Sequence, residues 1–487
     1  MIEYEESPLY RIMHPRSVAF WGASSNPMGM GSVQMSSLLA LGFEGPVYPV
    51  HPKEREIQGL KAYASIADVP GPVDLAVLVI PTRIVPDILE QCGKAGVKGA
   101  IVTTAGFGEK GEEGKAAQQR MVEISEKYDL KLLGPNCLGA VNTAENLNTT
   151  FLQYVAPPGF IGMASQSGSF VTQMFSYLNG FGLGFSQAIS VGNEAAIDLT
   201  DCIEYLGQCP ETKVIALYVE TIRRGAEFIK VAKEVSRIKP IVAYYVGGSE
   251  AGRNAALSHT GALAGPDELY DGIFNQCGII RSESIAELFD ICWLLGAQPL
   301  PKGDKIALLT HSGGPGASAA DAADRRGLTL AQFSEKTKER LLELVPHTAS
   351  IANPVDLTFD RKPQDYVETL PGILLEDHGV DSLFIYLMSP PPRIVKNFMA
   401  MFDDPEQAKA MAKQFLKSQC KSLAALPSKY GKPVVGGTFS PMSDPFMQQL
   451  QERGVVVLPS PERAVTALSA QARYAKFKEE MGEESGE

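Results

Sequence analysis

The feature of this chain that most limits its fold is a series of short apolar runs in which polar and apolar residues do not alternate. In the first third of the chain, the runs SVAFWGA, DLAVLVIP and GAIVTTAGF are separated by longer amphipathic segments. Continuous apolarity is typical of strands buried on both faces, as in a parallel sheet covered by helices. Residues 1–145 are therefore predicted to form a Rossmann-like α/β domain.

The same order of strand, turn and helix recurs further along the chain. The segment GFIGMASQSGSFVTQMFSYLNGFG begins a second α/β unit near residue 158, and KVIALYVE and PIVAYYVG supply further strands. Residues 296–305, GAQPLPKGDK, contain Pro and Gly without periodicity and are predicted to form a linker. A third α/β unit begins with KIALLTHSGGPGASAADAADRRG. Residues 476–487 are charged and are predicted to fray as a tail.

Size, charge and cysteine content exclude several classes of protein. A chain of 487 residues suggests about three domains. A net charge of −12 leaves no basic surplus to displace the counterions of a nucleic acid. Seven cysteines without a C-x-x-C pair fit a reduced protein better than a disulfide scaffold. With no signal-peptide pattern and no apolar run of about 20 residues, the sequence predicts a cytoplasmic protein without nucleic-acid or membrane partners.

The turn GASSNPMGMGS, after the first apolar run, is the first candidate ligand loop. It differs from G-x-G-x-x-G, because Gly22 is followed by Gly29 and Gly31, and it lacks the G-K-[ST] of a P-loop. A helix that starts near Gly31 would still present backbone N–H groups to a diphosphate. Lys53 follows the second predicted strand and would neutralise a phosphate there. The alternatives are a turn that serves only packing and a solvated surface lysine.

Two short segments of the chain resemble each other. Aligning MASQSGSFV (163–171) with LTHSGGPGA (309–317) places Gln166 opposite His311 and superimposes the two Ser-Gly pairs. Each segment predicts a helix amino terminus directly after a strand, where free N–H groups bind phosphate. The alternative is that the match reflects only the turns common to α/β folds.

A histidine and a glutamate are candidates for phosphoryl or acid–base chemistry. His259 lies in ALSHTGALAGPDELY, where small residues leave room around an imidazole nucleophile. Glu220 ends the run VIALYVE at the carboxyl edge of a predicted strand, where a carboxylate can orient an imidazole. A surface-loop histidine and a strand-end glutamate facing water remain open as alternatives. No metal-ligand spacing is found, so no metal site is predicted in this chain.

A set of segments, each weak alone, stands in a specific order over about residues 8–470. They are SVAFWGASSNP, PVHPKEREIQGLKAY, TTAGFGE, LLGPNCLG, LNTTF, ASQSGSF, SVGNEAAIDLTD, YVETI, SHTGALAG, HSGGPG and IANPVDL. This set resembles the succinyl-CoA synthetase superfamily, and most closely the α subunit of its acetate–CoA ligase (ADP-forming) branch. The resemblance implies an α/β protein with a Rossmann-like CoA-binding domain (1–145), then two flavodoxin-like ligase domains (146–298 and 299–475) and a charged tail (476–487).

The resemblance also implies an activity. A nucleoside-diphosphate-forming acyl-CoA synthetase, here of the ADP-forming type, converts acyl-CoA, ADP and phosphate reversibly into carboxylic acid, CoA and ATP. The intermediates would be an acyl phosphate and a phosphohistidine. We find no segment similar to the family's ATP-grasp domain, so ADP or ATP and Mg²⁺ are predicted to bind a separate β subunit in an α2β2-like hetero-oligomer. The acyl group and the choice of ADP over GDP are not determined by the sequence.

Residue by residue, the resemblance implies the following roles. His259 would be phosphorylated and Glu220 would steady it. The implied phosphate-binding residues are Ser165, Gln166, Ser167, Gly168, Ser169, Ser312, Gly313, Gly314 and Gly316. The implied CoA-binding residues are Gly22, Ala23, Ser24, Lys53, Pro81, Ala105, Asn136 and Cys137. The alternatives are a CoA-binding regulatory protein, or a CoA-ligase-like component of a protein acyltransferase, without ligase activity.

Overall fold

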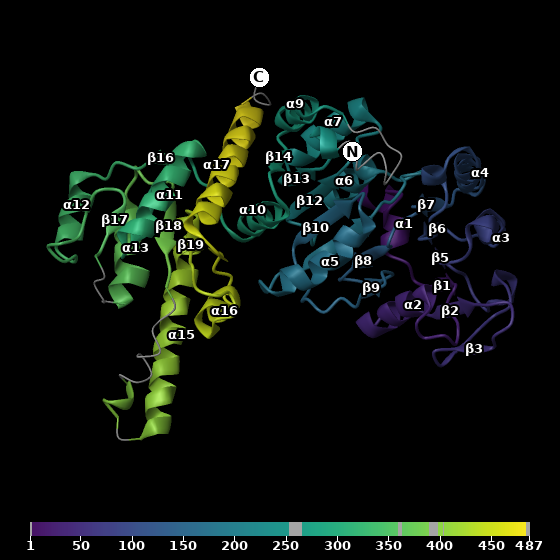
Figure 1. Ribbon diagram of the computed structural model, residues 1–487, viewed down its shortest axis with the longest axis horizontal. Helices are drawn as coiled ribbons and strands as arrows, with labels where there is room; N and C mark the ends of the chain where they lie inside the picture. The colour runs from purple at the N-terminus through teal and green to yellow at the C-terminus, as the bar shows by residue number, and fades with distance from the viewer. Residues whose placement is uncertain (1, 253–264, 359–362, 389–397, 403, 484–487) are drawn as a thin grey trace. The chain divides into compact units, whose positions relative to one another are not determined.

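The computed structural model of the protein describes residues 2–252, 265–358, 363–388, 398–402 and 404–483. The chain forms two compact units, which are described separately. Unit 1 comprises residues 1–179 and 183–283, and unit 2 comprises residues 180–182 and 284–487. In Figure 1, unit 1 runs from purple to teal and unit 2 from green to yellow.

Unit 1 begins with a five-stranded parallel sheet. Its strand order is β2-β1-β5-β6-β7, so the chain order reverses between β1 and β5. The strands are β1 (Val18–Trp21), β2 (Val47–Val50), β5 (Leu75–Leu78), β6 (Gly99–Val102) and β7 (Lys131–Leu133). In doubly wound sheets, ligands bind beyond the carboxyl ends of the strands at such a reversal.

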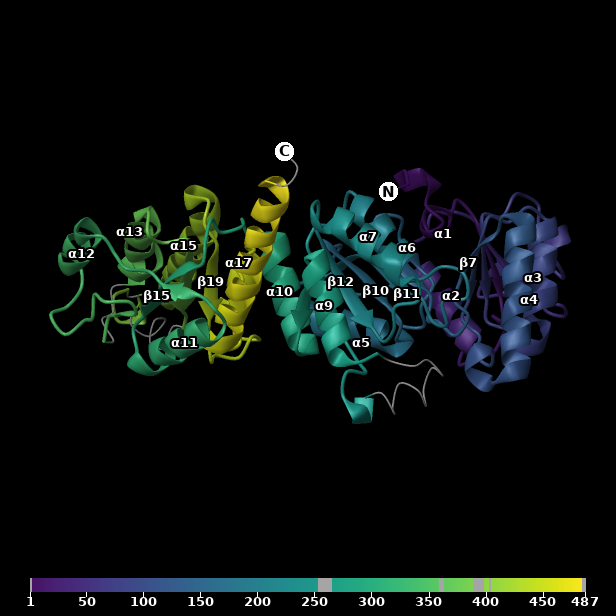
Figure 2. The ribbon, with the colours of Figure 1, turned by 90° about the horizontal axis from the view of Figure 1, so that it is seen from above.

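Helices cover both faces of this sheet, as the continuous apolar runs predict. Val18 and Phe20 share a core with residues of α2 (Met30–Leu41). Ala19 and Trp21 belong to a second core, which includes residues of α3 (Val85–Lys94) and α4 (Glu112–Tyr128). Figure 2 shows α3 and α4 side by side, consistent with their extensive packing. Because successive strand residues point to opposite faces, each strand needs apolar residues at every position.

A second sheet completes unit 1, in the order β14-β13-β12-β10-β11-β8-β9. Five of its strands are parallel, namely β10 (Ile161–Ser165), β11 (Phe185–Ser190), β12 (Val214–Val219), β13 (Ile241–Tyr245) and β14 (Ile280–Ser282). The hairpin β8 (Ala140–Asn142) and β9 (Leu147–Asn148) joins β11 in antiparallel orientation. The helices are α5 (Gly168–Asn179), α6 (Leu199–Gln208), α7 (Gly225–Ser236) and α9 (Asp267–Cys277).

One hydrophobic core connects the two sheets of unit 1. It runs from Val18 and Phe20 of β1, through α1 (Tyr10–Met13) and the β8–β9 hairpin, to the residues of β12 and β13 that face α6 and α7. The predicted boundary at residue 145 falls inside the β8–β9 hairpin. That boundary, like the others predicted, stays a prediction.

Unit 2 contains a third parallel sheet, in the order β16-β15-β18-β19-β20, with β17 also paired to β15. Its strands are β15 (Lys305–Thr310), β16 (Thr329–Leu330), β17 (Val355–Asp356), β18 (Ser382–Tyr386), β19 (Val434–Gly437) and β20 (Val457–Leu458). Its helices are α10 (Ile285–Ala297), α11 (Gly313–Arg325), α12 (Glu335–Leu342), α13 (Leu370–Glu376), α15 (Pro405–Tyr430), α16 (Pro445–Gln451) and α17 (Pro461–Glu483).

Two segments of unit 2 differ from the expectation. Helix α10, expected with the first ligase domain, packs on α17 and joins it through the Arg463–Asp290 ion pair at 2.6 Å. The residues from 476 onward do not fray at once, because α17 continues to Glu483. Irregular backbone spans 298–304, inside the predicted linker.

Several short elements were not predicted. They are the hairpin β3 (Glu56–Ile57) and β4 (Leu60–Lys61), the 3₁₀ turns η1 (Tyr4–Glu6), η2 (Ile66–Asp68), η3 (Thr82–Ile84) and η4 (Gly108–Lys110), and the π-helical turn η5 (Asp365–Thr369). Within the described residues, no helix is both long enough and apolar enough to cross a bilayer.

Candidate functional site

The turn after β1 is closely packed around its glycines. Gly22 has φ +97°, and a Cβ there would lie 2.0 Å from the Val79 carbonyl oxygen. A Cβ on Gly31 would lie 2.4 Å from the Gly22 backbone. The spacing of these glycines is therefore required by packing, which brings the start of α2 directly against the turn. The turn ends at the carboxyl edge where β1 and β5 adjoin.

Polar contacts already hold part of this turn. The Ser24 N–H donates to Ser32 Oγ at 3.0 Å, and the Ser25 N–H donates to Glu54 Oε2 at 2.7 Å. Ala23 is buried, and Lys53 is exposed. The carboxylate of Glu54 thus lies at the loop where the sequence predicts a phosphate, and the sequence reasoning did not find it. CoA binding by Gly22, Ala23, Ser24 and Lys53 stays a prediction.

The ends of the next strands contribute to the same sheet edge. Pro81 follows β5 and Ala105 follows β6, and Thr82 Oγ1 donates to the Ala105 carbonyl at 2.8 Å. The structure therefore brings the predicted positions 22, 81 and 105 to the carboxyl ends of three adjacent strands.

The loop after β7 connects the two halves of unit 1. Cys137 is buried, its Sγ lies 3.4 Å from the Val102 carbonyl oxygen, and burial raises its pKa to about 12. This thiol is therefore neutral and is not a nucleophile at physiological pH. Asn136 adopts φ +56°, and its Nδ2 donates to Asn193 Oδ1 at 3.1 Å. Contact of either residue with CoA stays a prediction.

The turn between β10 and α5 is closed by a hydroxyl group. Ser165 Oγ donates to the Ser167 carbonyl at 2.8 Å and accepts the Ser167 N–H at 3.1 Å. Helix α5 begins at Gly168, where a Cβ would lie 2.7 Å from Leu138 Cγ. This close approach holds the helix amino terminus against the loop that carries Asn136 and Cys137.

The turn between β15 and α11, in unit 2, has the same geometry. Thr310 Oγ1 donates to the Ser312 carbonyl at 2.7 Å and accepts the Ser312 N–H at 3.0 Å. The His311 ring lies 4.8 Å from the Tyr366 ring and 5.8 Å from the Tyr386 ring, centre to centre. Burial lowers the pKa of His311, so its imidazole is neutral near pH 7. Phosphate binding at either turn stays a prediction.

Gln166 ties the first turn to the end of β12. Its Oε1 accepts the N–H groups of Glu220 at 2.6 Å and Thr221 at 3.0 Å. Its Nε2 donates to the Thr221 carbonyl at 2.9 Å and to Glu194 Oε2 at 2.8 Å. These bonds use the full capacity of the amide. The contacts indicate that Gln166 holds a loop, a role that the sequence reasoning did not foresee.

Glu220 lies where it was predicted, at the carboxyl end of β12, with 8 % of its surface exposed. His259, its predicted partner, lies outside the described residues. The predicted pairing of the two side chains therefore stays a prediction.

Mostly polar residues of unit 1 line an open cavity of about 290 Å³ that includes Gln166 and Glu220. Asn193 Nδ2 donates across its wall to Glu109 Oε2 at 2.6 Å and to Gln118 Oε1 at 3.1 Å. The lining residues are Gly108, Glu109, Lys115, Gln118, Gln166, Gly192, Asn193, Glu194, Glu220, Thr221 and Arg223. The cavity thus joins loops of the first sheet to loops of the second.

Glu194 is one of the cavity residues that the sequence did not predict as site residues. It is 5 % exposed, and burial raises its pKa to about 7, although hydrogen bonding from Gln166 and the charge of Arg223 oppose the rise. A carboxyl group that titrates near neutrality in a cavity is a candidate functional group. The only signal in the sequence was a charged residue inside the small-residue segment SVGNEAAIDLTD.

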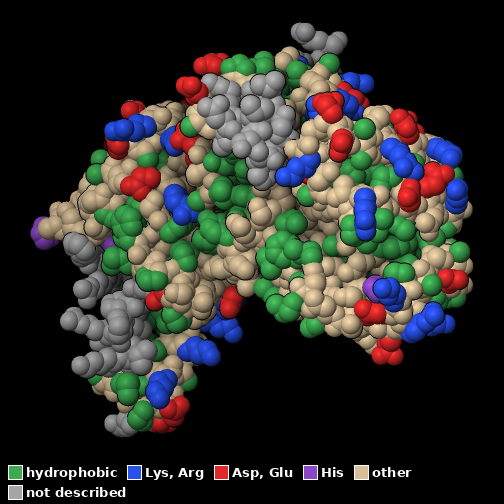
Figure 3. Space-filling model, turned by 45° about the vertical axis from the view of Figure 1, so that its right-hand side comes forward, with side chains coloured by type: hydrophobic (Ala, Val, Ile, Leu, Met, Phe, Trp, Pro, Cys, Tyr) green, Lys and Arg blue, Asp and Glu red, His purple; other side chains and the backbone are tan. Residues whose placement is uncertain are grey.

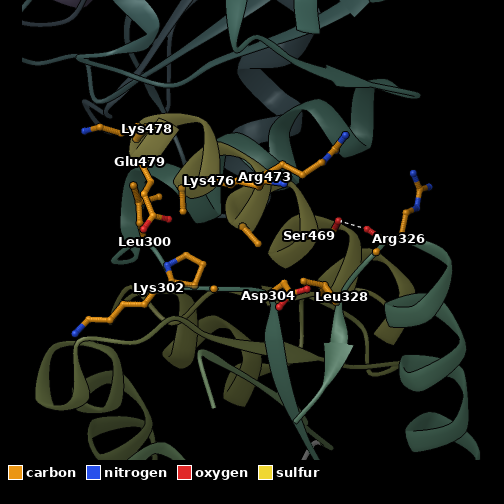
Figure 4. Close-up of a pocket in the computed structure, with 15 residues that line it drawn as sticks. Leu300, Lys302, Asp304, Arg326, Leu328, Ser469, Arg473, Lys476, Lys478 and Glu479 are labelled. Carbon is orange, nitrogen blue, oxygen red and sulfur yellow. Dashed lines mark hydrogen bonds between the residues drawn. The ribbon is translucent and has the colours of Figure 1, made fainter. Parts of the chain in front are cut away.

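A larger hollow, of about 810 Å³, lies in unit 2 between α17 and the loop before β15. Figure 4 shows that the basic side chains of Lys302, Lys478 and Arg326 spread apart, and that Ser469 Oγ donates to the Arg326 carbonyl at 2.6 Å. Without convergent polar groups, this hollow is a weaker candidate for a ligand site than the smaller cavity.

Surface charge gives no sign of a polyanion site on the face shown in Figure 3, where acidic and basic side chains are intermixed. Among the residues that the structure describes, no cluster of His, Cys, Asp or Glu has the arrangement of a metal site.

Comparison with known proteins agrees with this organisation. A family described as "CoA binding domain" matches residues 16–143, and one described as "Succinyl-CoA ligase like flavodoxin domain" matches residues 158–295. The chain is 39% identical to the acetate–CoA ligase [ADP-forming] II subunit alpha of Pyrococcus furiosus, over 95% of this chain and 97% of that protein. It is 38% identical to acetate–CoA ligase [ADP-forming] I of Archaeoglobus fulgidus, over 96% of this chain and 64% of that protein.

A solved structure is similar over the same extent. Acetyl-coenzyme A synthetase 1 of Ca. Korarchaeum cryptofilum, solved in complex with phosphate and ADP, superimposes with a TM-score of 0.87. The match is 32% identical and covers 98% of each chain.

Proposed function

Because the chain belongs to the family of ADP-forming acetate–CoA ligases, we propose that it performs the acyl-CoA half of this reaction through a phosphohistidine at His259. At the level of the family, the chain is a subunit of an acid–thiol ligase that acts with a separate partner subunit, as the α subunit from Pyrococcus furiosus implies. The α/β fold, with a CoA-binding domain followed by a succinyl-CoA ligase-like flavodoxin domain, agrees with this function. The regulatory and acyltransferase alternatives find no support among these relatives.

The observation that carries the proposal is the cavity in unit 1. Asn193 lines this cavity and is hydrogen-bonded to Asn136, in the loop after β7 that we call the CoA-side loop. Gln166 and Glu220 line the same cavity from the loops after β10 and β12, which we call the phosphoryl side. Transfer of an acyl group from CoA to phosphate requires the thioester and the phosphate to meet in one place. The adjoining loops support such a meeting point.

In the proposed mechanism, phosphate attacks the thioester carbonyl and CoA leaves as the thiol, giving an acyl phosphate. A ring nitrogen of His259 then attacks the phosphorus, and the carboxylate leaves. The helix amino terminus at Ser165–Ser169 stabilises the phosphoryl charge through its N–H groups, and the turn at Ser312–Gly316 in unit 2 is a second proposed phosphate-binding turn. Glu220 orients the imidazole by accepting its other N–H. Phosphohistidine finally donates to ADP, forming ATP.

The finer assignments follow the same proposal. We place ADP or ATP, with Mg²⁺, on an ATP-grasp partner subunit in an α2β2-like complex in the cytoplasm. Gly22, Ala23, Ser24 and Lys53 bind the CoA phosphates, while Pro81, Ala105, Asn136 and Cys137 line the path toward the thiol. The acyl substrate is a carboxylic acid of unassigned size.

The test is transfer of label from inorganic ³²P-phosphate, in the presence of acetyl-CoA, to the complex of this chain with its partner. The wild-type chain should acquire acid-labile, base-stable label, which His259→Asn should abolish while CoA binding is kept. His311→Asn is the matched control and should label normally. Label on His311 or on a serine would contradict the mechanism.

A further inference from the structure

Glu194, between β11 and α6, has no role in the mechanism above, yet its buried carboxylate accepts three hydrogen bonds. Its Oε2 accepts from Gln166 Nε2 at 2.8 Å and from Arg223 Nε at 3.1 Å. Its Oε1 accepts the Leu199 N–H at 3.0 Å. Three segments separated in the sequence therefore converge on one buried side chain.

The strand order explains this convergence. Strand β10 lies between β12 and β11, so Gln166 after β10 stands between Glu220 after β12 and Glu194 after β11. Gln166 bonds to both neighbouring loops. Through it, the Glu194 carboxylate is connected by two hydrogen bonds in series to the backbone of Glu220.

The neighbours of Glu194 face the CoA side. The N–H of Asn193 donates to the Pro135 carbonyl at 2.8 Å, and that of Ala195 donates to the Gly134 carbonyl at 3.1 Å. Gly192 has φ +58°, and a Cβ there would lie 2.3 Å from the Pro135 carbonyl oxygen. The segment 192–195 thus packs on the CoA-side loop while Glu194 turns toward the phosphoryl side.

The backbone at Glu194 is held in an unusual conformation. Its φ of +51° lies in the left-handed region, which is unfavourable for a residue other than glycine. Such conformations persist where surrounding contacts enforce them, and they cluster at functional sites. At Glu194, the backbone conformation directs the carboxylate toward Gln166 and Arg223.

We propose that Glu194 is a positioning residue for phosphoryl transfer, which holds Gln166 and, through it, the loop of Glu220 in register with the turn at the start of α5. This inference rests on the proposed function. The ionised carboxylate accepts from Gln166, Leu199 and Arg223 more strongly than a neutral acid would, because charge-assisted hydrogen bonds are stronger.

The charged groups around Glu194 come from several elements. Arg223 pairs with it from the loop after β12, and Asp198 and Cys202 of the α6 segment face it. Glu109, Lys115 and Glu220 line the same cavity. Burial dominates this balance and raises the pKa of Glu194 to about 7, so the carboxyl group ionises as the pH rises through neutrality and its hydrogen bonds then become charge-assisted.

The test compares Glu194→Gln with wild type in the complex with the partner subunit. The rate of ³²P-phosphate incorporation with acetyl-CoA is measured at a series of pH values from 5.5 to 8.5, which defines the midpoint of the pH response. We expect the variant to be about tenfold slower than wild type at pH 8.5, where Glu194 is ionised. At pH 5.5 we expect the two rates to agree within about twofold, because the protonated Glu194 of wild type and the Gln of the variant are both neutral. The ratio of the variant rate to the wild-type rate at each pH removes the pH effects that the two chains share.

Two further variants make the result specific. Asp290→Asn removes another buried carboxylate that pairs with an arginine, Arg463, in unit 2, and should label like wild type at both pH values. Arg223→Gln removes only the half-exposed partner of Glu194 and should move the midpoint of the wild-type pH response upward. It also serves if Glu194→Gln does not fold.

Equal rates for Glu194→Gln and wild type at pH 8.5, or the same loss in Asp290→Asn, would overturn the positioning role while leaving the proposed function intact. An unchanged midpoint in Arg223→Gln would also contradict it. Absence of label in the wild-type complex would refute the proposed function, and this inference with it.

Discussion

The turn after β10 in unit 1 and the turn after β15 in unit 2 have the same hydrogen bonds between a side-chain hydroxyl and the backbone but different surroundings. In both, a strand-end hydroxyl, Ser165 or Thr310, closes the turn by bonding to the residue two positions ahead. The residues in the middle of the two turns differ. Gln166 makes four side-chain hydrogen bonds, whereas His311 Nδ1 has no hydrogen-bond partner among the described residues.

The comparison distinguishes the hydrogen bonds that form the turn from the contacts that its middle side chain makes with the rest of the protein. The hydroxyl bonds orient the helix amino terminus and do not depend on the residue between them. The side chain at the middle position determines what the turn contacts. Gln166 joins a buried network of polar groups, whereas the His311 ring packs against two tyrosine rings. Similar turns therefore do not imply equivalent chemistry, and the comparison can be tested at each level.

The largest expected effect concerns which unit carries the phosphorylated residue. If His259 acts with the first turn, His259→Asn should lower phosphate incorporation below detection, a loss of at least about a thousandfold. His311→Asn should retain more than half of the wild-type incorporation. The measurement is radiolabelling followed by mapping of the labelled peptide, and label lost in both variants would break the distinction between the turns.

The next effect concerns stability. Gln166→Ala leaves the N–H groups of Glu220 and Thr221 and the carboxylate of Glu194 without their partner, which should cost about 4 kcal/mol of unfolding free energy in unit 1. His311→Gln introduces the residue of the first turn into the second and should cost about 1 kcal/mol or less. Calorimetry of the full chain should resolve the two, and equal shifts would contradict the comparison.

The two turns should also respond oppositely to pH. The pKa of Glu194 is raised to about 7, so its contribution to stability is complete below its ordinary value near 4.5 and is lost as the pH rises through 7. Relative to Glu194→Gln, wild type should lose on the order of 3 kcal/mol between pH 4 and pH 8. The pKa of His311 is lowered by burial, so its contribution is complete above 6.5 and is lost at lower pH.

Denaturation of each variant at several pH values, against wild type, tests these opposite signs. His311→Gln should gain stability relative to wild type as the pH falls below 6.5. A difference between Glu194→Gln and wild type that does not change with pH would show that the carboxyl group does not titrate in this window.

The smallest effect should be the same in both turns. Ser165→Ala and Thr310→Val each remove one buried hydroxyl and little else, and each should cost about 1 kcal/mol. Thermal unfolding of the full chain measures both. A cost several times larger for one of them would show that the shared hydrogen bonds are not equivalent.

Much of the fold could be predicted because its strands are buried on both faces. The strands that begin at Val18 and Leu75 are apolar at every position, and the strand that begins at Ile161 has no polar residue before Ser165. The β8–β9 hairpin was not predicted, since its segment VNTAENLN contains few apolar residues and its strands are held by pairing with β11.

A residue of the cavity could be identified from the sequence only where it directly follows a predicted strand. Glu220 was found in this way, at the carboxyl end of β12. Glu194 was not, because its partners Gln166 and Arg223 lie 28 and 29 residues away and meet it only through the order of β11, β10 and β12. Gln166 was chosen as a ligand for phosphate, although its amide is fully engaged with the protein.

The position of the β8–β9 hairpin matters to anyone who wishes to isolate the CoA-binding half of this chain. A fragment cut at residue 145 would keep β8 while losing β11, the strand with which β8 pairs. The peptide groups of β8 would then form an open edge beside newly uncovered apolar side chains, a combination that favours aggregation. Asn142, whose Nδ2 donates to the Met13 carbonyl at 2.9 Å, would hold that edge in place and keep it exposed. Truncation and domain transplantation should therefore treat unit 1 as indivisible.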